Sequence, residues 1–163
     1  MFARGASNRW ARFRAVPIPA LGTGGLLPDG IHECTIAEIS EAFGRFQESD
    51  RRQRLTRQLL AYVEELKSAG VAKHLIINGS YVTSKAKPAD IDLLLVLKDD
   101  VRLTDPVPPF QYNVRSKKYI KRHFEFDFFV GFDNDHTSTK VIELFREVKY
   151  RPDEVKGFLK IVL

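Results

Sequence analysis

Residues 73–97 read KHLIINGSYVTSKAKPADIDLLLVL and decide the fold of this chain. The stretch begins with a short apolar run at 73–78 and ends with a second apolar run at 91–97. Each run has the length and composition of a buried strand, and the second is apolar enough to be covered on both faces. The residues between them leave room for a short helix or a turn, so we expect the two strands to lie side by side.

Two carboxylates, Asp90 and Asp92, open the second strand. Side chains two residues apart on a strand project from the same face, so both can bind the same cation. Two like charges about 4 Å apart repel by about 4 kcal/mol near a protein surface, and a divalent cation would offset that cost. Oxygen ligands without His or Cys favour Mg²⁺ or Mn²⁺. Solvated acids at a strand end are the alternative interpretation.

Gly79 and Ser80 directly follow the first strand. Because glycine has no Cβ, the backbone there can approach a phosphate group closely, and the Ser80 hydroxyl and the N–H groups of a following turn can donate to it. We therefore expect a phosphate site at this turn, facing the cation site on the neighbouring strand.

A third strand is predicted at 123–131, HFEFDFFVG, because apolar and polar residues alternate along it. Asp127 is the candidate for a third carboxylate, which would complete a two-metal site. Glu125 is its substitute, because strict alternation places both acids on the same strand face. An acidic face that meets only water is the alternative.

The remaining pattern mixes helices and strands, so the fold class is α/β or α+β, with three or four core strands and three or four helices. The further segments expected are an irregular lead-in at 15–31, a helix opened by the capping box of Thr35 and Glu38 and running to about Phe46, a helix at about 50–69 that Ser49 caps and Gly70 ends, a loop at 99–109, a basic helix at 111–122, a helix at about 137–148 and a strand at 158–163.

The composition bounds the class of protein. The chain has 163 residues, of which 44% are apolar, so one domain with a sizeable core is expected. No stretch approaches the roughly 18 consecutive apolar residues of a membrane span, so no membrane partner is expected. The single cysteine, Cys34, allows no internal disulfide. Together these features predict a soluble protein of a reducing, cytoplasmic compartment.

Positive charge gathers in two places. Residues 1–14 contain four arginines and no acid, and they account for most of the formal net charge of +5. With Trp10 and Phe13 between its arginines, this arm can contact RNA, and a frayed, solvated terminus is the alternative. We therefore divide the chain into a flexible basic arm at 1–19 and one domain at 20–163. The second cluster predicts a solvated helix face, with a nucleic-acid surface as the alternative, and consists of Arg51, Arg52, Arg54 and Arg57.

Three short motifs carry a resemblance to a known superfamily. Asn78-Gly79-Ser80, a spacer of nine residues, Asp90-Ile91-Asp92 and the later Phe126-Asp127-Phe128 resemble the signature of the DNA polymerase β-like nucleotidyltransferases. That signature is a hydrophobic residue, Gly, then Gly or Ser, a short spacer, and Asp-hydrophobic-Asp or Glu. More widely, about 20–163 is similar to an uncharacterised bacterial nucleotidyltransferase-like family, through 25–33, 79–84 and the closing Lys156-Gly157.

This resemblance implies a short mixed sheet of three to five strands flanked by helices. The implied activity is Mg²⁺- or Mn²⁺-dependent transfer of a nucleoside monophosphate from an NTP such as ATP to a protein or RNA hydroxyl. The residues implied to bind the nucleotide are Gly79, Ser80, Ser84 and Lys85. The residues implied to be catalytic and to bind metal are Asp90, Asp92 and Asp127, with Glu125 as the fallback.

The chain departs from the family pattern at three places. Asn78 replaces the hydrophobic residue, Val82-Thr83-Ser84 replaces the Ala-Arg-Gly turn of minimal relatives, and Ala89 replaces the Ser before the first Asp. The missing Arg removes a fixed phosphate donor, for which Lys85 or Lys87 would substitute only in part, as flexible point charges.

The resemblance also implies a biological setting. Minimal relatives are similar in being encoded beside a ribonuclease toxin, which they neutralise by adding AMP to a Tyr. A protein partner in a bacterial toxin–antitoxin or defence module is therefore implied, and the reverse polarity is a toxin that modifies tRNA. The competing class is a catalytically inactive binding module, either an antitoxin that acts by contact or a nucleotide sensor. The sequence does not decide which NTP is used.

Overall fold

The structure is a computed structural model, and it describes residues 18–45 and 48–163. Within these residues a single mixed sheet has the strand order β1-β5-β2-β3-β4. β2 is antiparallel to β3 and to β5, whereas β4 is parallel to β3 and β1 is parallel to β5. The strands are β1 (Ile31–Glu33), β2 (Ala72–Asn78), β3 (Ile91–Leu97), β4 (Phe126–Gly131) and β5 (Phe158–Val162).

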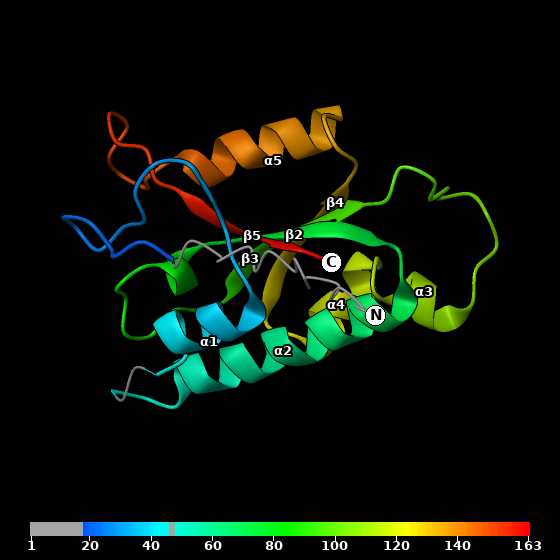
Figure 1. The fold of residues 1–163 in the computed structure, drawn as a ribbon, viewed down its shortest axis with the longest axis horizontal. Coiled ribbons are helices and arrows are strands. Elements are labelled where there is room, and N and C mark those ends of the chain that lie inside the picture. Colours follow the sequence, from blue (N-terminus) through cyan, green and yellow to red (C-terminus); the bar gives the residue numbers. More distant parts are fainter. Residues whose placement is uncertain (1–17, 46–47) are drawn as a thin grey trace, which may run out of the picture.

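Helices cover both faces of this sheet (Figure 1). The helices are α1 (Ile36–Phe43), α2 (Arg51–Ala69), α3 (Pro109–Asn113), α4 (Lys117–His123), α5 (His136–Arg146) and the short 3-10 helix η1 (Ser80–Val82). α5 lies over one face, and α1 and α2 lie over the other. The predicted fold class is confirmed, since a mixed sheet of five strands is flanked by helices.

β3 is buried on both faces, as its apolar sequence predicts. Leu93 and Leu95 belong to the core under α1 and α2. Leu94 belongs to a second, smaller core with Val141 and Phe145 of α5. Burying a side chain of this size contributes about 1.5–3 kcal/mol, so both helical layers are anchored to this one strand.

The two helices before β2 form largely where the sequence predicts them. The capping box is present, because the Thr35 N–H donates to Glu38 Oε2 (2.7 Å) and the Glu38 N–H donates to Thr35 Oγ1 (3.2 Å). α1 ends at Phe43, and its predicted end at Phe46 lies outside the described residues. α2 ends at Gly70, whose φ of 67° is the left-handed conformation that glycine favours.

The predicted cap of α2 is corrected by one residue. Asp50 is the N-cap and makes no side-chain capping bond, while Ser49 Oγ accepts from the Arg51 N–H at 3.3 Å. The hydroxyl of Ser49 therefore satisfies one of the free N–H groups at the start of the helix from just outside it.

Two predictions on the connecting segments are wrong. The basic helix expected at 111–122 is two short helices, α3 and α4, and α3 begins at Pro109 inside the expected loop. Proline is tolerated there because the first N–H of a helix has no intrahelical partner. The irregular lead-in is expected at 15–31, but its last residue, Ile31, is the first residue of the three-residue strand β1. β1 forms through parallel pairing with β5, and a local sequence pattern does not reveal such a pairing.

β4 is shorter than the strand predicted at 123–131. His123 is the last residue of α4, and Phe124 stacks on Phe126 with the ring centroids 5.1 Å apart. The Phe124 and Phe126 rings therefore share one side, but the strand itself begins only at Phe126.

No helix in the described part of the chain is both long enough and apolar enough to cross a bilayer. The basic arm, with its four arginines, Trp10 and Phe13, lies outside the described residues.

Candidate active site

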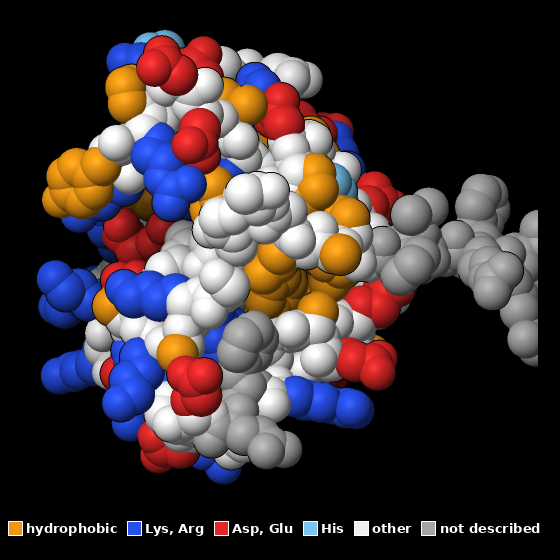
Figure 2. Space-filling model, turned by 90° about the vertical axis from the view of Figure 1, so that its left-hand side faces the viewer, with side chains coloured by type: hydrophobic (Ala, Val, Ile, Leu, Met, Phe, Trp, Pro, Cys, Tyr) orange, Lys and Arg blue, Asp and Glu red, His pale blue; other side chains and the backbone are white. Residues whose placement is uncertain are grey.

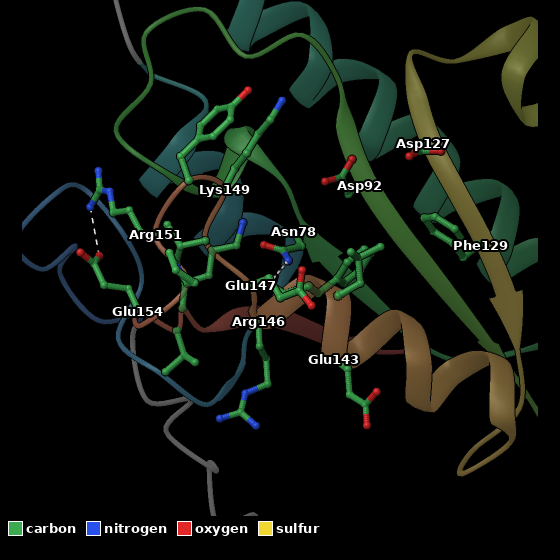
Figure 3. A pocket seen from close by; sticks show the side chains of 17 residues that line it. Asn78, Asp92, Asp127, Phe129, Glu143, Arg146, Glu147, Lys149, Arg151 and Glu154 are labelled. Carbon is green, nitrogen blue, oxygen red and sulfur yellow. Dashed lines mark hydrogen bonds and ion pairs between the residues drawn. The ribbon is translucent and has the colours of Figure 1, made fainter.

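Asn78, Asp92 and Asp127 lie in one row across three strands. Asn78 is the cross-strand partner of Asp92 in the antiparallel pair β2-β3, and Asp92 is the partner of Asp127 in the parallel pair β3-β4. Residues directly opposite each other in a sheet project to the same face. Figure 3 shows Asp92 and Asp127 on neighbouring strands. The sequence prediction that these two carboxylates come together is supported by this register.

This row opens into a cleft of about 1070 Å³. Along the rest of the same sheet face, Ile76 and Leu94 are covered by α5. The row lies where this cover ends, and the C-terminal half of α5 and the loop that follows it form the opposite wall of the cleft. Asp92 and Asp127 at this end of the sheet are therefore open to solvent and to any ligand in the cleft.

The electrostatics of Asp92 show that the carboxylates are close enough to repel one another. Burial, together with the charges of Asp90 and Asp127, raises the pKa of Asp92 from 3.8 to about 6, whereas Lys156 opposes the rise. Asp90 immediately precedes β3 and is not part of the cleft lining. A cation bound among these groups would remove the cost of ionising Asp92.

The donor set fits a cation only in part. Among residues 18–45 and 48–163 no three His, Cys, Asp or Glu side chains group closely enough to hold a metal ion. Mg²⁺, however, commonly takes one or two protein carboxylates together with substrate phosphates. Asp92 and Asp127 fit that pattern, a cation held jointly with a phosphate ligand, better than they fit a site made of protein atoms alone.

Asn78 is a polar side chain in this cleft that the sequence marks only as a departure from the family pattern. It is 1% exposed, and its Nδ2 donates to the Phe145 carbonyl at 2.5 Å. Within the described residues its Oδ1 has no hydrogen-bond partner. Leaving such an acceptor unpaired costs about 1–3 kcal/mol, so the fold bears this cost at the edge of the cleft.

Gly79 is needed for the close packing of the turn against Asp92. Its φ is +85°, and a Cβ there would lie 2.7 Å from Asp92 Oδ2. The closest neighbour of this glycine is therefore a site carboxylate. Ser80 is half-buried and begins η1. Neither residue lines the cleft itself, so the turn supports the carboxylate row from behind.

Arg52 holds the segment that follows this turn, and here the predicted solvated arginine face is wrong. The side chain is fully buried, and its guanidinium donates to the carbonyls of Tyr81 (2.7 Å), Thr83 (2.6 Å) and Lys85 (2.6 Å). Burial lowers its pKa. Of the predicted face, Arg54 and Arg57 are exposed.

The other two residues assigned to nucleotide binding are not brought to the cleft either. Ser84 and Lys85 are exposed and are not part of its lining. The Ser84 N–H donates to the Gly25 carbonyl at 3.0 Å, and a Cβ on Gly25 would lie 1.8 Å from Ser84 Oγ. The loop at 83–89 is therefore tied to the glycine-rich lead-in.

Glu125 is engaged elsewhere and does not join the row. Both of its carboxylate oxygens lie 2.9 Å from the Arg51 guanidinium, and Arg54 Nε lies 3.1 Å away. The hydrogen bond from Arg51 lowers the pKa of Glu125. The expected shared face with Asp127 fails because β4 begins one residue after Glu125.

The match to known proteins is at the level of a family. A family model, described as a family of unknown function (DUF6932), matches residues 19–162. No curated protein and no solved structure matches the chain. Function therefore has to be argued from the geometry of the cleft.

Proposed function

We propose that this chain, which belongs to the DUF6932 family of unknown function, is a divalent-cation-dependent nucleotidyltransferase. The substrate class is an NTP, and the acceptor is a hydroxyl of a protein or an RNA. The observation that supports this most directly is the register of Asp92 opposite Asp127, beside the Gly79 turn and at the open end of a cleft.

In the proposed reaction the acceptor oxygen forms a bond to the α-phosphorus of the NTP. The bond from that phosphorus to the oxygen leading to the β-phosphorus breaks, and pyrophosphate leaves. Asp92 and Asp127 would hold the cation, with Asp90 beside them. A bound Mg²⁺ or Mn²⁺ supplies polarisation of the phosphate and charge neutralisation of the leaving group. Asp127, which is exposed in the cleft, is positioned to take the proton of the acceptor hydroxyl.

Gly79 and Ser80 keep a supporting part in this proposal. They set the turn against which Asp92 packs, and the Ser80 hydroxyl is the polar group of that turn. Ser84 and Lys85 take no part, because the loop that carries them is turned toward the lead-in.

An acceptor-bearing partner is expected to dock over the mouth of the cleft. Leu144, Tyr150 and Val155 line the cleft and are exposed, so they offer apolar contact. The lead-in, the loop at 83–89 and the loop after α5 meet at one end of the molecule (Figure 1), and Lys and Arg side chains gather along one side of that end (Figure 2). Such a surface suits a protein or RNA partner in a toxin–antitoxin or defence module.

The test is transfer of labelled nucleotide. Purified protein is incubated with each NTP radiolabelled at the α-phosphate, Mg²⁺ and cell extract, and label on macromolecules and release of pyrophosphate are measured. We expect both signals with at least one NTP. Asp92→Asn and Asp127→Asn are expected to lower them by about a hundredfold or more, whereas the exposed Asp100→Asn leaves them unchanged.

A binding module without catalysis is the second candidate, and one observation favours it. Among the described residues no three-ligand metal group is formed by His, Cys, Asp and Glu. In that case NTP binds, Asp92→Asn weakens the binding, and no label moves with any NTP. That result would refute the proposed nucleotide transfer and would support nucleotide binding at the same site.

A further inference from the structure

Four cationic side chains line the cleft, and three of them have partners of their own. Arg146 pairs with Asp29 at 2.9 Å, and Arg151 pairs with Glu154 at 3.0 Å, as the dashed line in Figure 3 marks. The Lys149 ammonium lies 5.2 Å from the centre of the Tyr150 ring. The fourth cation is Lys156.

Lys156 differs from the other three in burial and in partners. It is half-buried, and within the described residues its ammonium has no carboxylate at ion-pair distance. Burial lowers its pKa, and the charge of Asp92 opposes that effect. A partly desolvated ammonium without a close counter-ion lacks the compensation that buried charges have.

The backbone that carries Lys156 is held in place. Its N–H donates to the Arg146 carbonyl at 3.0 Å. The following residue, Gly157, packs so closely that a Cβ would lie 2.0 Å from the Pro28 carbonyl oxygen. These contacts fix the backbone of Lys156 against the rest of the domain, independently of the exposed loop that precedes it.

We propose that Lys156 binds a phosphate of the ligand's polyphosphate chain in this cleft, facing the carboxylate row of Asp92 and Asp127. This inference rests on the proposed function and adds a residue to it. A cation site and an ammonium that line one cleft fit a ligand with several phosphates, one bound through the carboxylates and another through the lysine.

This assignment also accounts for a gap in the sequence pattern. The Arg of minimal relatives is absent, and Lys85 and Lys87 are exposed and do not line the cleft. Among the described residues that line it, Lys149 and Lys156 are cations without an ion pair, and of these two only Lys156 is half-buried. A lysine ammonium binds phosphate as a point charge and needs no fixed fork geometry.

The test uses inorganic tripolyphosphate as the probe, titrated calorimetrically into the full chain with Mg²⁺. Lys156→Met is compared with Lys149→Met, which removes the same charge from the rim of the same cleft. We expect Lys156→Met to weaken binding about tenfold or more, and Lys149→Met to change it less than about twofold. Equal losses in both variants, or no loss in Lys156→Met, would overturn the proposal.

A second measurement on the wild-type chain covers the case in which Lys156→Met does not fold. Lysine acylation is followed by mass spectrometry with and without tripolyphosphate. Selective protection of Lys156 supports the proposal, and unchanged acylation of Lys156 contradicts it.

The two proposals fail in different ways. If nucleotide transfer persists in Lys156→Met with an unchanged KM for NTP, the proposed role of Lys156 is refuted and the proposed enzymatic activity stands. If tripolyphosphate binding depends on Lys156 but no nucleotide is transferred, the proposed enzymatic activity is refuted and the proposed anion site stands.

Discussion

Asp127 lies directly opposite Asp92 in the parallel pairing of β3 with β4. The two carboxylates come from strands that are separated in the sequence by two helices and a long loop. Paired residues share a face of the sheet. A one-residue shift of either strand would therefore turn its carboxylate to the other face and would turn the core side chains of that strand outward. The packing of Leu93, Leu94 and Leu95 on both sides of β3 thereby also fixes the site.

The first prediction concerns the pKa of Asp92. Removing the neighbouring charge by Asp127→Asn is expected to lower the pKa of Asp92 from about 6 toward 3.8, and burial keeps it from falling the whole way. Carboxyl chemical shifts followed by NMR across the pH range, in the presence of a chelator, measure it. An unchanged midpoint would mean that the two carboxylates do not sense each other.

The same pKa sets the direction of a stability change. The folded state holds the Asp92 proton more tightly than the unfolded state, so this contribution to stability is full below about pH 3.8 and is lost as the pH rises through about 6. In chelator, the stability of the wild type relative to Asp92→Asn is therefore expected to fall across that window. Urea unfolding at several pH values measures the difference.

The second prediction compares two glycines that share a positive φ and differ in ψ. Gly70 has φ 67° and ψ 14°, the left-handed region, where alanine is strained by about 1–2 kcal/mol. Gly79 has φ 85° and ψ −169°, a region that essentially only glycine adopts. Only at Gly79 does the new Cβ also meet Asp92, since nothing lies within 4 Å of it at Gly70. Gly79→Ala is therefore expected to lose at least about 1 kcal/mol more than Gly70→Ala in urea unfolding. Equal losses would refute the close contact.

The third prediction concerns the buried arginine of α2. Arg52→Lys keeps the charge but cannot donate to several carbonyls at once, so it leaves some of those of Tyr81, Thr83 and Lys85 unpaired. A loss of about 3–5 kcal/mol is expected from breaking such a buried charged network. Arg57→Lys on the same helix is the matched control and is expected to stay within about 0.5 kcal/mol. Similar values for both variants would contradict the structural part assigned to Arg52.

Much of this fold follows from local patterns in the sequence. Apolar runs predict β2 and β3, a left-handed glycine predicts the end of α2, and the capping box of Thr35 predicts the start of α1. Alternation along the third predicted strand marks Asp127 as a candidate, and its place opposite Asp92 comes from the pairing of β3 with β4. Each of these signals is contained within a single segment.

The errors arise where a residue is decided by a segment far away in the chain. Arg52 has the spacing of a solvated helix face, but the loop at 83–89 folds over it and buries it. Glu125 lies two residues before Asp127, so alternation places both on the same strand face. In the structure Glu125 forms ion pairs with Arg51 and Arg54, and β4 begins only after it. Lys156 lines the cleft because the loop that carries it returns beside Asp92.

The last prediction separates structure from ligand binding at Asn78. Asn78→Leu keeps the size of the side chain, removes the unpaired Oδ1 and loses the hydrogen bond to the Phe145 carbonyl. These effects oppose each other, so urea unfolding is expected to change by no more than about 1 kcal/mol, while NTP binding weakens about tenfold because the ligand loses its acceptor. Ser138→Ala removes another buried polar side chain, one that does not line the cleft, and it is expected to leave NTP binding unchanged. A large loss of stability in Asn78→Leu with NTP binding retained would mean that Asn78 serves only to hold the end of α5.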